Sequence, residues 1–352
     1  MKKVLLASTA LAFSAGMAAA EITITGSAEM GIKGGDRYDD ADTDNTVEDN
    51  ARFHQDYTIK VVGSGETDNG LTFGMSVEFD DVGNDAVNDG TTTDNEFVFI
   101  SGSFGTLTLG EIDGAYDKAM AEVALAGGSL ADDETEHAGF NGNSGFDGTQ
   151  DNQILRYDYA FGDFGVSVSY EQFNNGQDGD SAVVIGSDPD DNIGIGVTYS
   201  TQWTGVEMTF GLAYQQGSKA FDADGTEGAY WYDGDVWGAS VAADFGNGFQ
   251  AGLNYSSYDF DGTATATTGT VGAETAKSGT DYDHYGIGMA YTMNAWTFAA
   301  NYGKYDYSGG VADEDGWGLL VNYDLGGGAV MQFGYGEGES TESWSFGIAM
   351  SF

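Results

Sequence analysis

The last ten residues of the chain alternate strictly between large apolar side chains and small or polar ones. The large apolar residues are Trp344, Phe346, Ile348, Met350 and Phe352, and serine, glycine or alanine separates them. A period of two is the signature of a β-strand with one apolar face and one face in water. The sequence ends on the last aromatic residue of this strand. If the strand belongs to a large sheet, we expect earlier segments to repeat its pattern.

The same alternation recurs along the chain and predicts about sixteen strands. Their connections are alternately short, as at Gly162-Asp163, and long and acidic, as at Gly34 to Asn50. A soluble β-sandwich accounts for any two of these hairpins taken alone. Across the whole array, however, one face is always apolar while the other carries Thr, Ser, Gly and charged residues. That pattern is typical of a barrel with lipid outside and water inside. We therefore predict an all-β fold, a 16-stranded antiparallel transmembrane β-barrel.

The composition supports this interpretation and excludes other classes of protein. The chain has 57 acidic and 11 basic residues and a net charge of −46, which repels nucleic acid. It has no cysteine, so neither disulfides nor thiolate chemistry is available. It has one proline, Pro189, as expected of strands that need nearly every backbone donor.

The first twenty residues predict an export signal. Lys2 and Lys3 precede an apolar run from Val4 to Met17, and Ala18-Ala19-Ala20 gives a small-residue cleavage site. We therefore expect residues 1–20 to be a signal peptide that is removed, and residues 21–352 to form the barrel domain.

The longest gap between strands runs from Asp113 to about Asn152 and is rich in acidic residues. We expect a short helix within it, over Tyr116 to Leu125. Connections of this length are uncommon unless they are functional or disordered. A barrel of sixteen strands is too wide for its side chains to fill, so a loop inside it would narrow an aqueous channel.

Taken together, these features resemble the general diffusion porins of Gram-negative bacteria, especially the alphaproteobacterial, Rhodobacter-type branch. The most specific matches are Glu21 to Gly31, Leu107 to Glu111 and Ser343 to Phe352. The resemblance implies a homotrimer in the outer membrane, in contact with lipid and lipopolysaccharide, that conducts ions and small hydrophilic solutes passively. It also implies that the third extracellular loop folds into the lumen as a constriction.

In that family, acids on the loop face bases on the barrel wall. The wall candidates here are Arg52, His54, Lys60 and Arg156, which fall at inward positions of their strands. The loop candidates are Asp113, Asp117, Glu122, Asp132, Asp133 and Glu134. The excess of carboxylates predicts a preference for cations. We expect no catalytic residue, no cofactor and no defined metal site.

Loose association of Ca²⁺ or Mg²⁺ with the acidic loops is a further expectation, because hard cations need only clustered oxygen ligands. Asp40, Asp42 and Asp44 have the spacing of a calcium loop, as do Asp222 and Asp224 before Gly225. Neither continues with the glycine and distant glutamate of an EF-hand.

Two alternative functions remain open. A substrate-specific channel would show a helical track of inward aromatic residues, whereas the inward positions of the predicted strands are mostly small or charged. A barrel hydrolase would need a Ser–His or Asp–His pair converging at one rim. The three histidines are spread over a strand, the long loop and the start of another strand, which offers little convergence.

Overall fold

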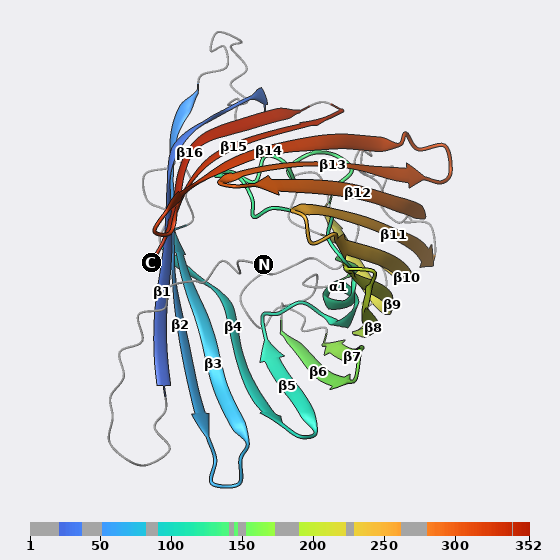
Figure 1. The fold of residues 1–352 in the computed structure, drawn as a ribbon. Helices are drawn as coiled ribbons and strands as arrows, with labels where there is room; N and C mark the ends of the chain where they lie inside the picture. Colours follow the sequence, from blue (N-terminus) through green and yellow to red (C-terminus); the bar gives the residue numbers. More distant parts are fainter. Residues whose placement is uncertain are drawn as a thin grey trace.

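In the computed structural model the chain forms one closed barrel of antiparallel strands with a loop inside it (Figure 1). The described residues are 21–36, 51–81, 91–140, 144–146, 153–172, 190–222, 229–261, 280–339 and 341–352. Within them sixteen strands follow one another round the barrel, and β1 pairs with β16. The predicted all-β, 16-stranded architecture is confirmed.

The strands and the single helix of the described residues have the following bounds. They are β1 (Glu21–Gly34), β2 (Arg52–Glu66), β3 (Thr72–Asp81), β4 (Thr91–Gly102), β5 (Gly105–Gly110), α1 (Ala115–Ala119), β6 (Ile154–Phe161), β7 (Phe164–Glu171), β8 (Asn192–Trp203), β9 (Val206–Asp222), β10 (Ala229–Asp244), β11 (Phe249–Asp261), β12 (Tyr282–Met293), β13 (Trp296–Tyr307), β14 (Glu314–Gly326), β15 (Ala329–Gly338) and β16 (Glu342–Ser351).

The last residues of the chain close the barrel. Met30 of β1 pairs with Ile348 of β16, and the register continues to Gly34 opposite Trp344. Beyond β16, the Phe352 N–H donates to the Gly26 carbonyl at 2.8 Å. Closure leaves no unpaired sheet edge, which a β-sheet in hydrocarbon requires.

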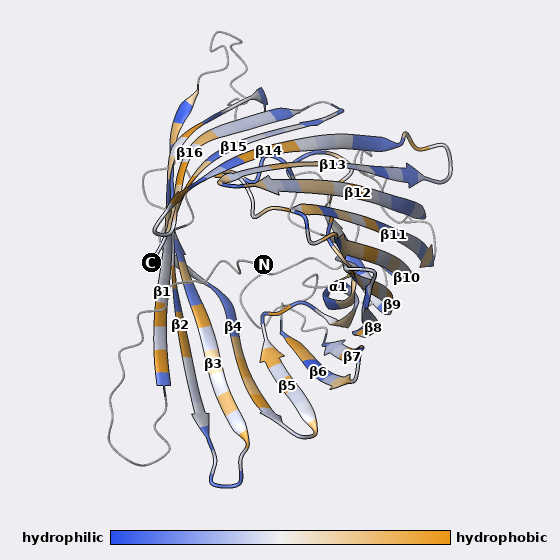
Figure 2. Cartoon of the chain, viewed as in Figure 1, coloured by the Kyte–Doolittle hydropathy of each residue, from blue (hydrophilic) through white to orange (hydrophobic). Residues whose placement is uncertain are grey.

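The register fixes which side chains point out of the barrel. Gly31 lies opposite His54 and Gly347, and a Cβ on Gly31 would meet Leu130 of the internal loop at 2.5 Å. That face is therefore the inner one, and the alternate positions point outward. Outward apolar side chains remain exposed in the isolated chain, for example Phe53 at 89% and Leu212 at 59%. Figure 2 shows apolar residues recurring along the strands of the wall.

Outward aromatic residues form two bands, one near each end of the strands. Near the short turns, Phe161 stacks on Phe164 with ring centroids 5.6 Å apart, and Phe164 lies 4.7 Å from Tyr199. Towards the other end, Tyr255 contacts both Trp237 and Tyr285 at 5.1 Å. Two such bands bounding an apolar zone are typical of the lipid interfaces of membrane barrels.

Several predicted boundaries were wrong. The β8–β9 turn lies at Thr204 and Gly205, not at residues 201–202, and both residues have positive φ, 50° and 89°. β9 continues to Asp222, inside the region predicted to be a loop from 216 to 228, and β10 begins at Ala229, directly after that region. The helix has only five residues, 115–119. The predicted signal peptide, Pro189 and the aspartates 40, 42, 44 and 224 lie outside the described residues. Among the described helices, none is long and apolar enough to cross a membrane.

Candidate pore and its internal loop

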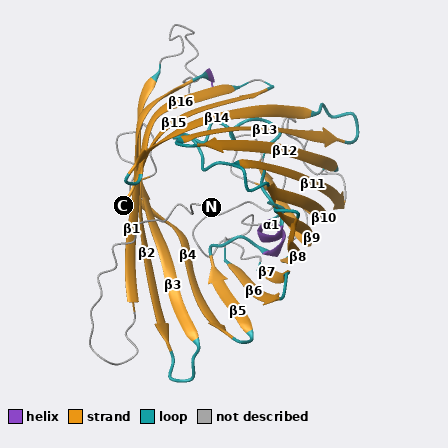
Figure 3. Cartoon of the chain, viewed as in Figure 1, coloured by secondary structure: helices purple, strands orange, loops and turns teal. Residues whose placement is uncertain are grey.

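The segment between β5 and β6 enters the barrel and lies along its inner wall, beginning with α1 (Figure 3). Serines on three strands fix its first part. Ser169 Oγ of β7 accepts from the Ala115 N–H at 2.8 Å, and Ser240 Oγ of β10 accepts from the Ala121 N–H at 2.8 Å. The Tyr116 hydroxyl donates to Ser256 Oγ of β11 at 2.9 Å. The loop is therefore attached to the wall from its first turn.

Side-chain amides on the wall hold the rest of the loop. Asn301 of β13 donates to the Glu134 carbonyl at 2.8 Å, and Gln332 of β15 donates to the Gly128 carbonyl at 2.9 Å. A loop buried against a wall needs partners for its backbone groups, because an unpaired buried carbonyl costs about 1–3 kcal/mol. Neutral amides supply these partners without adding charge to the lumen.

The wall is glycine where the loop backbone comes closest to it. A Cβ at any of five wall positions would lie 1.8 to 2.0 Å from a carbonyl oxygen of the loop. These positions are Gly211, Gly288, Gly303, Gly318 and Gly336. No side chain fits at such a distance. Because these wall positions have no side chains, the described part of the loop lies directly against the wall from β9 to β15.

Inward aromatic residues of β10 to β13 form a buried cluster with the loop. Tyr258 and Tyr282 stack with ring centroids 4.4 Å apart, and Phe146 of the loop lies 5.9 Å from Tyr258. Tyr258 is 2% exposed and Tyr282 7%. The prediction that inward positions are mostly small or charged was therefore wrong here, because it ended these strands too early. The cluster packs under the loop and so forms no aromatic track along the water.

Two of the three histidines, His137 and His284, also hold the loop against the wall. His137 of the loop contacts the Asn301 side-chain oxygen through Nε2 at 2.7 Å, and His284 of β12 contacts the Gly139 carbonyl through Nε2 at 2.7 Å. Both rings are buried, whereas a hydrolase needs a histidine that substrate can reach.

The predicted wall bases lie on β2 and β6, and three of them contact a carboxylate of the wall itself. His54 Nε2 is 3.7 Å from Glu29, Lys60 is paired with Glu78, and Arg156 Nε donates to Asp158 at 3.0 Å. Arg52 is the cross-strand neighbour of Lys33. One contact joins the predicted wall and loop sets directly, from Arg156 Nη1 to the Asp113 carbonyl.

The predicted loop acids divide by burial. Asp113, Glu122 and Asp132 are exposed and Asp117 is partly exposed, whereas Asp133 is 0% and Glu134 4% exposed. The last two pack against β14 and β15, where a Cβ on Gly318 or Gly336 would meet their backbone oxygens. Only the first four are placed to meet a solute.

Sequence reasoning missed two charged residues that meet across the gap between loop and wall. Lys118 of α1 lies 3.5 Å from Asp158 of β6, with the base on the loop and the acid on the wall. The available signal was that Lys118 is the only lysine or arginine between residues 111 and 153.

The environment of two loop glutamates raises their pKa above the usual 4.5. For Glu134 the main cause is burial, and the charges of Asp132 and Asp133 add to it. For Glu122 partial loss of solvent acts first, and the neighbouring Asp113 carboxylate adds to it. Both groups hold their protons more tightly in the folded protein than in the unfolded chain.

We therefore expect the contribution of these two glutamates to the free energy of unfolding to be largest below the ordinary glutamate pKa and to fall as the pH rises through the raised values. Glu134→Gln should remove part of this dependence, because the variant cannot ionise at the buried position. Urea unfolding of folded protein in detergent, measured at several pH values between 4 and 8, checks this. Identical pH slopes for Glu134→Gln and the unmodified protein would contradict it.

Comparison with known proteins identifies a protein family for this chain. The family model described as Gram-negative porin matches residues 7–343. The chain belongs to the Gram-negative porin family. A porin of Rhodobacter capsulatus is 26% identical over 332 residues, covering 92% of this chain and 96% of that protein. A porin of Fuscovulum blasticum is 28% identical over 250 residues, covering 66% of this chain and 78% of that protein.

Solved structures agree in fold with this porin. A porin structure refined at 1.8 Å resolution has a TM-score of 0.64 at 21% identity, covering 94% of this chain and all of that one. A mutant of Rh. blastica porin has a TM-score of 0.63 at 21% identity, with the same coverage. This porin is a channel protein of the outer membrane of a Gram-negative bacterium, and small solutes and ions cross it passively.

Proposed function

We propose that this general diffusion porin prefers cations and that its constriction lies between the internal loop and the inward residues of β2 and β6. One observation supports the preference. The bases His54, Lys60 and Arg156 are each next to a wall carboxylate. The loop acids Asp113, Glu122 and Asp132 are exposed to water, so their carboxylates add to the negative charge that a permeating ion meets.

Such a constriction biases permeation without binding ions tightly. Two charges about 10 Å apart in water interact by only about 0.4 kcal/mol. The preference is tested by the zero-current potential across a planar bilayer with a tenfold KCl gradient. The proposal expects the dilute side to become positive as K⁺ crosses faster. A potential of zero, or of the opposite sign, would refute the preference but not the channel.

Replacing Arg52 and Arg156 with glutamine is expected to raise the K⁺ to Cl⁻ permeability ratio by about twofold, the factor that about 0.4 kcal/mol gives. Lys304→Gln is the matched control. Lys304 lies on the outer face between Asp306 and Asp313, so the control removes one positive charge outside the lumen, where the test variant removes two inside it. An unchanged ratio in the Arg52/Arg156 variant, or an equal rise in the control, would remove these arginines from the constriction.

We also propose that the protein is a homotrimer, and that a groove across the outer face of β2, β1, β16 and β15 belongs to the subunit contact. The groove has a volume of about 710 Å³ and is lined by Met30, Phe53, Met331 and Phe346 around the amide of Gln55. A polar side chain facing lipid is costly. A second subunit can supply a hydrogen-bond partner for the Gln55 amide. The mass of the detergent-solubilised protein, measured by light scattering, tests this; a monomer would contradict it.

A third proposal concerns lipopolysaccharide and divalent cations. Outward carboxylates stand directly opposite one another at the long-loop end of the barrel, in the pairs Asp235 with Asp259, Asp283 with Asp306, and Glu337 with Glu342. Like charges in directly opposed positions destabilise a sheet. Outward tyrosines next to these pairs contact the carboxylates. For example, the Tyr335 hydroxyl donates to Glu342 at 3.0 Å. Mg²⁺ or Ca²⁺ would relieve this repulsion and bridge it to lipid phosphates.

The described residues contain no group of three or more His, Cys, Asp or Glu side chains able to hold a metal ion. Association is therefore expected to be diffuse. In lipopolysaccharide-containing vesicles, EDTA should lower the melting temperature by a few degrees, and Mg²⁺ should restore it while Na⁺ at equal ionic strength does not. Equal recovery with Na⁺ would show charge screening alone and would contradict bridging.

A further inference from the structure

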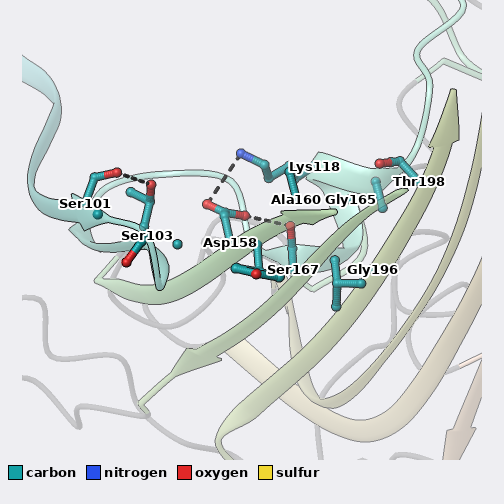
Figure 4. A pocket seen from close by; sticks show the side chains of 15 residues that line it. Ser101, Ser103, Lys118, Asp158, Ala160, Gly165, Ser167, Gly196 and Thr198 are labelled. Carbon is teal, nitrogen blue, oxygen red and sulfur yellow. Dashed lines mark hydrogen bonds and ion pairs between the residues drawn. The ribbon is translucent and has the colours of Figure 1, made fainter. Parts of the chain in front are cut away.

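A cavity of about 460 Å³ lies on the short-turn side of α1, between that helix and the ends of β4 to β8 (Figure 4). Its size is that of a small-molecule site. The β4–β5 and β6–β7 hairpins form one side, β8 another, and Lys118 of α1 points in from the loop. The cavity therefore lies beside the path that a solute takes once it has passed the internal loop.

Hydroxyl groups supply most of the polar lining. They belong to Ser101, Ser103, Thr106, Ser167 and Thr198. Glycines between them, including Gly165 and Gly196, have no side chain and therefore leave the cavity open. The apolar surface comes from small groups such as Ala119 and Ala160. Hydroxyls at intervals on a shallow, partly apolar surface match a solute that carries several hydroxyls on a short carbon chain.

The charges of the cavity set it apart from the acidic protein around it. Asp158 accepts hydrogen bonds from Ser167 Oγ at 2.6 Å and from Arg156 Nε at 3.0 Å, and Lys118 Nζ lies 3.5 Å away. Two cations thus share one carboxylate: Lys118 and Asp158 line the cavity, and Arg156 contacts Asp158 from beside it. The side chain of Arg156 is 11% exposed and also binds the Asp113 carbonyl, whereas that of Lys118 is 41% exposed. Lys118 is the cation that a solute can reach.

We propose that this cavity is a weak subsite for small hydroxylated carboxylates, the sugar-acid class. The solute carboxylate pairs with Lys118, and its hydroxyls exchange hydrogen bonds with the serines and threonines of the hairpins. A free cation is disfavoured because Asp158 is already paired with Lys118 and Arg156. The inference rests on the proposed diffusion function, because a solute reaches the cavity only through an open lumen. The subsite binds organic anions weakly in a lumen whose other charges repel them.

The test is block of ion current by added solute in a planar bilayer held at constant KCl. The probes are gluconate, glucose as the uncharged polyol, and propionate as the carboxylate without hydroxyls, with ionic strength matched by sodium methanesulfonate. We expect gluconate to reduce the current at a concentration at least about threefold lower than either of the other probes. Only gluconate has both a carboxylate to pair with Lys118 and hydroxyls to bond the serines and threonines.

Lys118→Gln should raise the half-blocking concentration of gluconate about fivefold, the factor that about 1 kcal/mol gives. Its effect on glucose should be small. Lys304→Gln is the control: it removes one cation on the outer face, where Lys304 lies between Asp306 and Asp313, and should leave gluconate block unchanged. Equal block by gluconate and glucose, or equal effects of the two variants, would overturn the subsite. Current in KCl without probe reports the channel itself, so failure of the subsite is distinguishable from failure of the diffusion function.

Discussion

Replacing Gly288 and Gly318 together with alanine is expected to displace the internal loop and raise single-channel conductance. A Cβ at Gly288 would lie 1.9 Å from the Val123 oxygen, and one at Gly318 would lie 2.0 Å from the Glu134 oxygen. Both atoms belong to the loop backbone, so neither clash is relieved by rotating a side chain. Overpacking of this kind costs about 1–3 kcal/mol per site. The loop is held by separate hydrogen bonds and the aromatic cluster, whereas each strand is held by continuous ladders on both sides, so the loop should yield before the barrel does.

Gly63→Ala is the control for this experiment. Its Cβ would meet only Met75 Cγ, at 3.5 Å, in ordinary contact. We expect the control to keep the conductance and noise of the unmodified channel, while the double variant conducts more and with larger fluctuations. Unchanged conductance in a double variant that folds normally would mean that the loop is not what narrows the lumen.

Leu212→Arg is expected to be the most destabilising single substitution that we consider on the outer face. Leu212 lies on β9 between the outward aromatics Phe210 and Tyr214 and is 59% exposed in the isolated chain. In a bilayer that exposure is to lipid. An arginine there costs about 2–4 kcal/mol near the midplane. The free energy of unfolding from phospholipid vesicles, measured by urea titration, should fall by that amount.

Thr209→Arg, three residues earlier on the same strand, is the matched control. Thr209 faces the lumen, where its hydroxyl lies 3.1 Å from Ser200 Oγ and lines an internal cavity. An arginine there stays in water, so we expect the stability to change by no more than about 0.5 kcal/mol. Equal losses in the two variants would contradict the assignment of the two faces.

The fold was predictable from the sequence because its signal is local. Each spanning strand shows one face to lipid, so alternation in any ten residues, as from Ser343 to Phe352, reports a strand without knowledge of its neighbours. The signal fades where a strand leaves the lipid. On the outward face of β9 the apolar run stops at Tyr214, and Gln216 follows although the strand continues to Asp222. The outer boundaries were missed for this reason.

The contacts that hold the internal loop against the wall were not predictable in the same way. Tyr116 meets Ser256, 140 residues away, and Gln332 meets Gly128, 204 residues away. Nothing local to either residue reports such a contact. Burial of Glu134 beside an exposed Asp132 depends on where Gly318 and Gly336 leave room, not on the acidic composition that the three neighbouring acids share. The inward positions of Arg52, Lys60 and Arg156 followed from alternation, but the pairing of Lys60 and Arg156 with wall carboxylates did not.

The central claim is that lipid surrounds the barrel and that water fills the lumen beside the internal loop. Conductance of the purified, folded protein in a planar bilayer tests it most directly. We expect stepwise increases in current, each step linear in voltage and proportional to the bulk conductivity of the salt solution, as for ions moving through water. Folded protein that inserts into the bilayer but conducts no current would contradict the claim.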